Sequence, residues 1–317
     1  MRFRLVDRLV RDMGAERSAL VAALRAHPAS IAPKYFYDEL GAALYGAICE
    51  LPEYYATRTE RSIFEANRAE IANAIGAGGQ FVDLGAGDGA KAEAWLPYLV
   101  PKRYVAVDIA GHALKRTLER LAPRFPDVKM TGVVTDFTSG LDLEADLTAE
   151  PVAFFYPGSS IGNFTPEDSI ELLRRVQAYC ARRPGSGLLI GVDTKKSRAR
   201  LEAAYDDRLG VTALFNRNVL NHVNRLIGSD FDVAAFRHRA FYAEDRARIE
   251  MHLEALNDHT VTLDGAPRRF AEGERIHTEN SYKYAPDEFD TLLALAGFAT
   301  VRRWLDANGD FAVFWAA

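Results

Sequence analysis

One short segment constrains the fold of this chain more than any other feature: residues 81–91, with the sequence FVDLGAGDGAK. Its apolar beginning predicts a buried strand, and the helical pattern that resumes after Gly89 predicts a helix. The three glycines between them allow positive φ angles and let a ligand approach the backbone without a side chain in the way. The first turn of the helix offers N–H groups that have no partner within the helix. The segment therefore predicts a strand, a turn and a helix, with a ligand bound over the turn.

Two kinds of ligand fit this turn. The glycine spacing satisfies the looser dinucleotide fingerprint, which would make the chain an NAD-dependent dehydrogenase. Charge favours a different ligand, because a pyrophosphate would lie beside Asp88 and near Asp83, whereas the sulfonium and amino groups of S-adenosylmethionine would be attracted to both acids. Asp108 ends the next apolar run, where the ribose diol of either ligand would be bound.

Strands and helices alternate regularly along the chain after the turn. We expect strands at 80–84, 103–108, 128–134, 152–156 and 188–193, separated by helices at 89–99, 111–122 and 165–181. Strands that alternate with helices of this length form a parallel sheet with right-handed crossovers. The last helix, 286–296, precedes two strands at 299–305 and 311–316, which are joined through Asn308-Gly309 and predict a hairpin. An antiparallel final pair fits a methyltransferase sheet better than a dehydrogenase sheet.

The segment between the fifth strand and the last helix is too long for a simple connection within such a sheet. It contains helical patterns and then strand-like runs, at 197–207, 211–227, 236–242 and 248–256. Further helical patterns precede the first strand, at 14–26, 39–49 and 59–75. We therefore expect an α/β domain formed by 59–199 plus 286–317, and a second, α+β domain formed by 1–58 plus 200–285.

Composition is that of an ordinary globular protein. The chain has 317 residues, of which 48% are hydrophobic and 26% charged, and a net charge of −5. Lys and Arg are scattered among acids and no apolar run is long enough to span a bilayer, so we expect neither a nucleic-acid nor a membrane partner. Cys49 and Cys180 lack the spacing of a disulfide or zinc cluster, and the histidines lack metal-binding spacing. We expect no metal, and a reducing, cytoplasmic location.

Polar and aromatic side chains follow the third and fourth strands, at the ends where ligands bind in open α/β sheets. Asp136 is placed to hydrogen-bond an adenine amino group and Phe137 to cover the ring, and the alternative is an Asx turn with a packed Phe. The Gly- and Ser-rich loop 157–164 is a good position for substrate contacts. The polar stretch 216–218 lies inside a helix, and we interpret it as an internal hydrogen-bond network.

Several stretches occur together in an informative order and spacing. They are the loop around Tyr37, 51–55 (LPEYY), the glycine turn, 160–163 (SIGN), 204–207 (AYDD), 215–218 (FNRN), 249–251 (IEM) and the Thr278-Glu279 segment. Nearly end to end, the chain thereby resembles the histidine-specific N-alpha-methyltransferases of ergothioneine biosynthesis. One departure is Tyr156-Pro157, where a less kinked apolar lead into the loop would be expected.

The resemblance implies a Rossmann-like class I methyltransferase sheet with a second, substrate-binding domain. It also implies S-adenosylmethionine-dependent methylation of the α-amino group of L-histidine, three times, to give the trimethylated betaine hercynine. The cofactor-binding residues implied are Gly85, Gly87, Lys91, Asp108, Asp136 and Phe137. Tyr54, Asn163 and Tyr205 would hold the backbone groups of histidine, Tyr37, Glu279 and Ser281 would surround its imidazole ring, and Met251 would line the pocket.

Methyl transfer from a sulfonium to an amine is an in-line displacement, so alignment and removal of water supply most of the acceleration. We expect Tyr37 and Tyr205 to act in catalysis by positioning, with no dedicated general base, and we expect a monomer. Aromatic faces also tolerate the growing quaternary ammonium. The alternative within the same chemistry is a methyltransferase for another amino acid or small amine.

Overall fold

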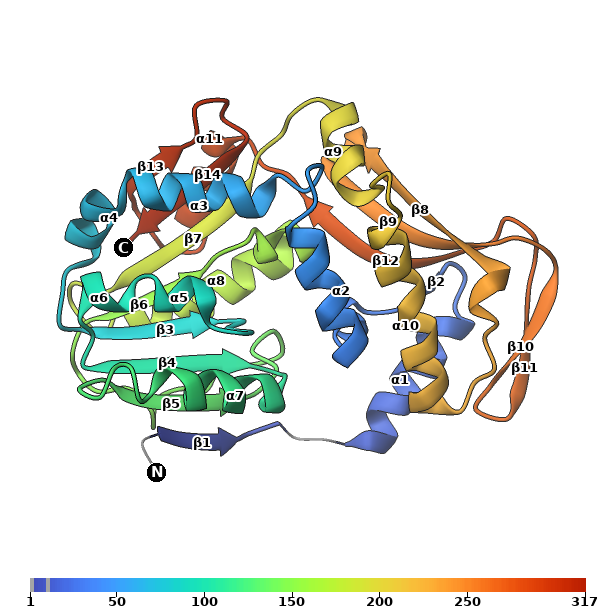
Figure 1. Ribbon diagram of the computed structural model, residues 1–317, viewed down its shortest axis with the longest axis horizontal. Coiled ribbons are helices and arrows are strands. Elements are labelled where there is room, and N and C mark those ends of the chain that lie inside the picture. The colour runs from blue at the N-terminus through green and yellow to red at the C-terminus, as the bar shows by residue number, and fades with distance from the viewer. Residues whose placement is uncertain (1–2, 10–11) are drawn as a thin grey trace. The chain divides into compact units, whose positions relative to one another are not determined.

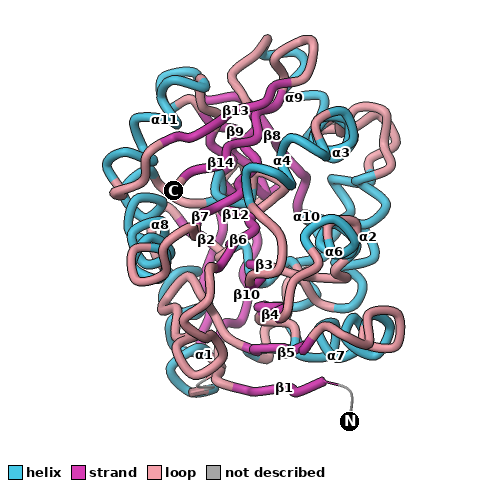
Figure 2. The backbone as a smooth tube through the Cα atoms, turned by 90° about the vertical axis from the view of Figure 1, so that its left-hand side faces the viewer, coloured by secondary structure: helices cyan, strands magenta, loops and turns pink. Residues whose placement is uncertain are grey.

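The computed structural model describes residues 3–9 and 12–317 (Figure 1). This part of the chain divides into two compact units, and each is discontinuous in sequence. The first unit comprises residues 3–9 with Arg58–Thr194 and Tyr284–Ala317, and the second comprises residues 12–57 with Lys195–Lys283. The backbone trace in Figure 2 shows helices and strands in both units.

The first unit is built on one eight-stranded sheet. In order across the sheet, the strands are β1 (Phe3–Asp7), β5 (Lys129–Val134), β4 (Arg103–Asp108), β3 (Gln80–Leu84), β6 (Val152–Tyr156), β7 (Gly187–Asp193), β14 (Phe311–Ala316) and β13 (Thr300–Leu305). The pairs from β1 to β7 are parallel, whereas β14 runs antiparallel to both β7 and β13. The expected mostly parallel sheet with an antiparallel final pair is confirmed.

Continuous apolar runs form the centre of this sheet because both of its faces are covered. Every residue of β3, β6 and β7 is buried, as is typical of parallel strands between helical layers. The helices are α3 (Ala56–Ala66), α4 (Arg68–Ile75), α5 (Ala90–Glu93), α6 (Leu96–Leu99), α7 (Gly111–Leu121), α8 (Pro166–Cys180) and α11 (Pro286–Leu295), with a 3₁₀ turn, η2, at Ser160–Asn163. Thr165 caps α8 by accepting a hydrogen bond from the Asp168 N–H, and Pro166 follows at the first helical position.

The second unit packs helices against a four-stranded sheet with the order β2-β12-β9-β8. Its strands are β2 (Ala29–Ser30), β8 (Phe236–Ala243), β9 (Arg248–Ala255) and β12 (Arg275–Tyr282), and β10 (His259–Leu263) and β11 (Ala266–Phe270) form a separate hairpin. Its helices are α1 (Met13–Arg25), α2 (Glu39–Cys49), α9 (Arg198–Tyr205) and α10 (Val211–Ile227), with 3₁₀ turns at Pro33–Phe36, Val233–Ala235 and Glu244–Arg246. Residues Phe215, Val219 and Val223 of α10 belong to the core of this unit, which also contains Met251.

The structure differs from the sequence-based expectation in four places. The single helix expected over 89–99 is two short helices, α5 and α6. Residues 3–7 were expected in the second domain, but β1 pairs with β5 at the edge of the first unit's sheet. The expected helix over 59–75 is two helices that meet at Asn67. The segment 275–282, for which no strand was expected, is strand β12, whose register shifts between His277 and Glu279. A bulge of this kind interrupts the two-residue alternation by which strands are recognised.

Among residues 3–9 and 12–317, none of the helices combines the length and the apolar content that a membrane crossing requires.

Candidate functional site

The glycine turn has the backbone conformation that its composition predicts. Gly85 follows β3 directly and has φ +71°, a value that disfavours any residue with a Cβ atom. Gly89 has φ +66°, and a Cβ atom there would lie 2.5 Å from the Cγ2 atom of Thr117 on α7. The turn is therefore restricted to glycine both by its backbone angles and, at Gly89, by packing.

Asp108 lies beside this turn, at the carboxyl end of the neighbouring strand β4. Its Oδ2 atom accepts a hydrogen bond of 2.8 Å from the Gly87 N–H, and its Oδ1 atom accepts one of 2.8 Å from the Ala110 N–H. The two bonds fix the orientation of a partly exposed carboxylate. Since each carboxylate oxygen has a further lone pair, Asp108 can also accept hydrogen bonds from a ribose diol.

Asp83 has a different role from the one that its charge suggested. It is buried within β3 and accepts a hydrogen bond of 2.9 Å from the Tyr104 hydroxyl. Burial raises the pKa of Asp83 to about 7. Asp83 is therefore only partly ionised near neutral pH. Of the two acids expected to attract the sulfonium and amino groups of S-adenosylmethionine, Asp83 and Asp88, only Asp88 is exposed.

Lys91 is held by an acid that the sequence analysis did not single out. The Lys91 Nζ atom lies 2.6 Å from the Oε2 atom of Glu60, and the Oε1 atom of Glu60 accepts a hydrogen bond of 2.6 Å from the Gly158 N–H. Glu60 is only 1% exposed and therefore links α3, the glycine turn and the loop after β6. The available signal was its position on the apolar stripe of α3, because Ile63 and Phe64 at i+3 and i+4 are also buried.

Asp136 and Phe137 make the local contacts of the simpler alternative. The Oδ1 atom of Asp136 accepts hydrogen bonds from the backbone N–H and the hydroxyl group of Thr138, which is an Asx turn. Phe137 packs edge-to-face on Tyr156, with 5.8 Å between ring centroids. Both residues lie just beyond β5 at the carboxyl edge of the sheet, and their contact with adenine stays a prediction.

Asn163 ends the 3₁₀ turn η2 in the loop that follows β6. The departure from β6 is sharp, because Gly158 and Ser159 have φ angles of +78° and +57°. The Ser159 hydroxyl accepts a hydrogen bond of 2.9 Å from the Asp193 N–H at the end of β7. The loop is thus fastened to the carboxyl edge of the sheet, on the same unit as the glycine turn.

Four tyrosines of the second unit form a continuous row of edge-to-face contacts. Tyr37 packs on Tyr45 at 5.8 Å, Tyr45 on Tyr54 at 6.5 Å, and Tyr54 on Tyr205 at 6.3 Å between ring centroids. Burial raises the pKa of Tyr54 well above its usual value. Its hydroxyl is therefore protonated at neutral pH and is a hydrogen-bond donor rather than a base. Tyr45, which lies on α2, was not among the predicted site residues, because an aromatic residue in a helix is ordinarily a core residue.

Three polar residues lie on one face of the end of β12, since side chains at i, i+2 and i+4 share a face. Glu279 comes first, and burial raises its pKa to about 7 while the charge of Lys283 opposes that rise. Ser281 accepts hydrogen bonds from the Tyr205 hydroxyl at 2.7 Å and from the Lys283 Nζ atom at 2.8 Å. The sequence analysis predicted Glu279, Ser281 and Tyr205 but not Lys283.

Met251 lies next to this row. It is directly opposite Glu279 in the pairing of β9 with β12, and it is 1% exposed. Its backbone oxygen accepts a hydrogen bond of 3.0 Å from the Thr278 hydroxyl. Met251 therefore belongs to the apolar core of this unit, on the strand that pairs with β12 at Glu279, and its predicted position lining the substrate pocket stays a prediction.

Asn216, on α10, is the centre of a buried hydrogen-bond network that reaches β9, β12 and Tyr205. Asn216 donates to the backbone oxygen of His252 at 3.0 Å and accepts from the Thr278 hydroxyl at 2.8 Å. It also contacts His238 Nδ1 at 2.8 Å, while His238 Nε2 lies 2.8 Å from the backbone oxygen of Tyr205. Burial lowers the pKa of His238, so the ring is neutral, with Nε2–H donating to Tyr205 and Nδ1 accepting. The predicted internal hydrogen-bond network is confirmed.

Comparison with known proteins assigns the family. The model of a family described as histidine-specific methyltransferase, SAM-dependent, matches residues 16–317. This chain belongs to that family. The methyltransferase prediction and its methyl donor, S-adenosylmethionine, are thereby confirmed, and the dehydrogenase alternative is set aside.

Curated relatives of this methyltransferase extend over nearly its whole length. A histidine N-alpha-methyltransferase from Mycolicibacterium smegmatis is 38% identical over 98% of this chain and 98% of that protein. A histidine N-alpha-methyltransferase from Mycobacterium tuberculosis is 38% identical over 100% of both chains. Ergothioneine biosynthesis protein 1 from Neurospora crassa is 30% identical over 89% of this chain, which corresponds to 32% of that longer protein.

One group of side chains in the methyltransferase has the composition of a metal site, although the sequence showed no metal-binding spacing. Glu250, His252 and His277 bring ligand atoms within 4.8 Å of one another on neighbouring strands. Each of the three side chains already makes a hydrogen bond: Arg248 binds Glu250 Oε1, His252 Nε2 lies 2.9 Å from Glu250 Oε2, and His277 Nε2 lies 2.9 Å from Asn280. The Arg248 cation would also repel a metal ion, so we assign none to this cluster.

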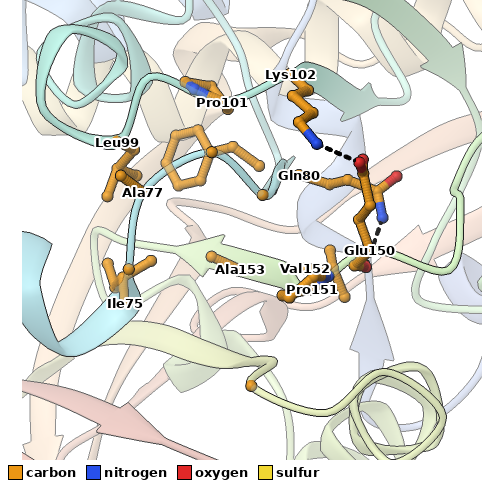
Figure 3. A pocket seen from close by; sticks show the side chains of 15 residues that line it. Ile75, Ala77, Gln80, Leu99, Pro101, Lys102, Glu150, Pro151, Val152 and Ala153 are labelled. Atoms are coloured by element: carbon orange, nitrogen blue, oxygen red, sulfur yellow. Dashed lines mark hydrogen bonds and ion pairs between the residues drawn. The ribbon is translucent and has the colours of Figure 1, made fainter.

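A pocket of the first unit lies at the amino ends of the sheet strands, opposite to the end at which a nucleoside would bind (Figure 3). It is lined by the beginnings of β3 and β6 together with Ile75, Leu99 and Lys102. Figure 3 shows Lys102 and Gln80 directed at Glu150, which binds them through a carboxylate and a backbone oxygen. Ligands of open α/β sheets bind at the carboxyl ends of the strands, whereas this pocket is at the amino ends.

Proposed function

We propose that this methyltransferase transfers three methyl groups to the α-amino nitrogen of L-histidine, giving the trimethylated betaine hercynine, as a step of ergothioneine biosynthesis. The observation that carries the proposal is the pair of polar side chains, Glu279 and Ser281, on β12. Glu279 offers a carboxyl group and Ser281 a hydroxyl group on the same strand face, beside Met251 and the tyrosine row. A neutral imidazole ring has one N–H donor and one nitrogen acceptor, which this pair of side chains complements.

We assign the S-adenosylmethionine site to the first unit. Its conformation supports the assignment, because the backbone at Gly85 and Gly87 is open to a ligand and Asp108 is oriented beside it. Lys91 supplies a cation for the carboxylate of the methionyl group, and Glu60 fixes its position. Asp136 and Phe137 are assigned to adenine by resemblance, and Asn163 to the substrate's backbone groups.

The side chains act by binding and orienting rather than by chemical participation. S-adenosylmethionine supplies an electrophilic methyl group on a sulfonium, so that no group of the protein has to activate the donor. In each transfer the S–CH3 bond breaks as the N–CH3 bond forms, S-adenosylhomocysteine is the leaving group, and the amine loses one proton to water. Tyr54 remains protonated because burial raises its pKa, which makes it unsuited to remove a proton. The aromatic faces of Tyr37, Tyr54 and Tyr205 suit an amine that becomes a permanent cation, since cations are attracted to aromatic faces.

Tyr37→Phe and Tyr205→Phe test this assignment. Each change removes one hydroxyl group and keeps the ring, and a neutral hydrogen bond contributes about 1 kcal/mol. We expect KM for histidine to rise and kcat to fall by no more than about tenfold, measured by steady-state methylation assays. Loss of turnover with unchanged histidine affinity would contradict the positioning role and identify that tyrosine as a general base.

Product analysis tests the function itself. After incubation with S-adenosylmethionine and a mixture of free amino acids, mass spectrometry should show histidine with one, two and finally three added methyl groups. Fragmentation should place all three on the α-amino nitrogen. Methylation of a different amino acid, or a reaction that stops after one methyl group, would refute the proposed substrate or the proposed extent.

We further propose that the protein works as a monomer in the cytoplasm. Cys49 and Cys180 are free thiols, and Cys180 is buried, as a reducing compartment permits.

A further inference from the structure

Lys283 is a buried cation that the assignments above do not use. It directly follows β12 and is 1% exposed, which makes it one of the largest fully buried side chains. Removing an ammonium group from water costs several kcal/mol unless the protein provides compensating partners. A buried lysine therefore lowers the stability of the folded protein unless its contacts compensate for the lost hydration. Two of the residues that Lys283 contacts, Tyr205 and Ser281, are residues that we assign to histidine.

The contacts of Lys283 form a triangle with two hydroxyl groups. Its Nζ atom donates to the Ser281 Oγ atom at 2.8 Å and to the Tyr205 hydroxyl oxygen at 3.0 Å. The Tyr205 hydroxyl donates in turn to Ser281 Oγ at 2.7 Å. An ammonium group has only donors, so Lys283 fixes the direction of its two bonds.

These directions determine what Ser281 can offer to a ligand. A serine oxygen has two acceptor positions and one proton. Lys283 and Tyr205 occupy both acceptor positions, and the proton of Ser281 is therefore left to donate to a third group. Glu279, on the same face of β12, supplies an acceptor next to this donor.

We propose that Lys283 is a positioning residue that makes Ser281 a pure hydrogen-bond donor toward the imidazole ring, so that the enzyme requires an unprotonated ring nitrogen at that position. This inference rests on the proposed function, because it assumes that Ser281 and Glu279 contact histidine. An imidazole nitrogen with a lone pair satisfies the Ser281 proton, whereas an N–H or C–H group there leaves the proton unpaired. Leaving a site's polar group unpaired is the strongest means of rejecting an analogue.

The test compares histidine with the two pyrrolylalanines, in which one ring nitrogen or the other is replaced by C–H. The wild-type enzyme should prefer histidine over the better of these analogues by about 100-fold in kcat/KM. Lys283→Met keeps the length of the side chain and removes the ammonium group, so Ser281 can accept as well as donate. In this variant we expect KM for histidine to rise about tenfold, KM for S-adenosylmethionine to stay unchanged, and the preference over the analogue to fall below about tenfold.

Ser281→Ala and the double variant provide the second measurement. If Lys283 acts through Ser281, the effects of the two changes on the preference are not additive, and Lys283→Met has no further effect in the Ser281→Ala background. A purely structural role would lower kcat/KM for histidine and its analogues equally and leave the preference intact. A wild-type enzyme that does not distinguish histidine from either analogue would overturn the inference even if Lys283→Met did not fold.

Failure of this inference can be told apart from failure of the proposed function. If Glu279→Ala weakens histidine binding while Lys283→Met keeps the wild-type preference, the histidine site stands and the role of Lys283 is refuted. If neither change alters histidine kinetics, the assignment of histidine to β12 is itself wrong.

Discussion

Replacing Glu279 by Ala should raise KM for histidine about 100-fold, while KM for S-adenosylmethionine remains within about twofold of the wild-type value. On the assignment proposed above, the substitution would remove the acceptor for the imidazole N–H and leave that donor unpaired. It also leaves the Lys283 cation without the nearby carboxylate that opposes its charge. Steady-state kinetics with each substrate varied in turn measure the two constants separately.

Glu279→Gln is the matched control, because it keeps an acceptor oxygen and removes the charge. The pKa of Glu279 is about 7 owing to burial, so the wild-type carboxyl group ionises and becomes a better acceptor as the pH rises through 7. KM for histidine should therefore fall between about pH 6 and pH 8 in the wild type, and this ionisation should be absent from the profile of Glu279→Gln. Equal losses for both substrates in Glu279→Ala would instead indicate a structural role.

The raised pKa of Glu279 also predicts how the stability of the fold depends on pH. The pKa of Glu279 in the folded protein, about 7, lies above the ordinary value of 4.5 for a glutamate carboxyl group, so ionisation of Glu279 costs free energy of folding. The free energy of unfolding of the wild type therefore decreases progressively as the pH rises from 4.5 through 7. Glu279→Gln should consequently gain in melting temperature relative to the wild type at alkaline pH and lose that advantage below pH 4.5.

Asp108→Ala should weaken S-adenosylhomocysteine binding about 100-fold and leave the specificity among amino acids unchanged. Two charge-assisted hydrogen bonds to the ribose diol would be lost. The Gly87 N–H, which now donates to Asp108 Oδ2 at 2.8 Å, would also lose the partner that orders the turn. Isothermal titration calorimetry measures the affinity directly.

Asp127→Ala is the control for that experiment. Asp127 is an exposed acid at the amino end of β5, so its removal changes the net charge of the same unit equally but does not touch the glycine turn. Its affinity for S-adenosylhomocysteine should match that of the wild type. Comparable losses in the two variants would mean that long-range charge, rather than a diol contact, explains the effect.

The sheet of the first unit could be predicted from sequence because its signals are local. Strands β3, β4 and β6 were predicted at their observed bounds, since each is an apolar run between turn residues. The edge strand β1 was missed because three of its five residues are exposed and it has no apolar run, so that only its pairing with β5 defines it. Strand β12 was missed because its polar face carries the candidate site.

The candidate site was predicted only in part, for a related reason. Glu279 and Ser281 were reached through family resemblance, because a carboxylate or a serine in a polar segment has no distinctive pattern. Lys283 and Glu60 are buried charges, and burial is a property of tertiary structure that composition does not reveal. The alternation of Glu279, Ser281 and Lys283 becomes meaningful once β12 is known to be a strand.

The chain order of the first unit has a consequence for biosynthesis. Strand β14 comes last in the sequence, yet it lies between β7 and β13 rather than at an edge. Until residues 311–316 have emerged from the ribosome, β7, whose residues are all buried in the folded sheet, has one edge without its strand partner. During synthesis, the second unit is therefore complete while one edge of β7 in the first unit still lacks a strand partner. At that stage we expect this edge to be prone to aggregation and to be a target for chaperones that bind extended apolar segments.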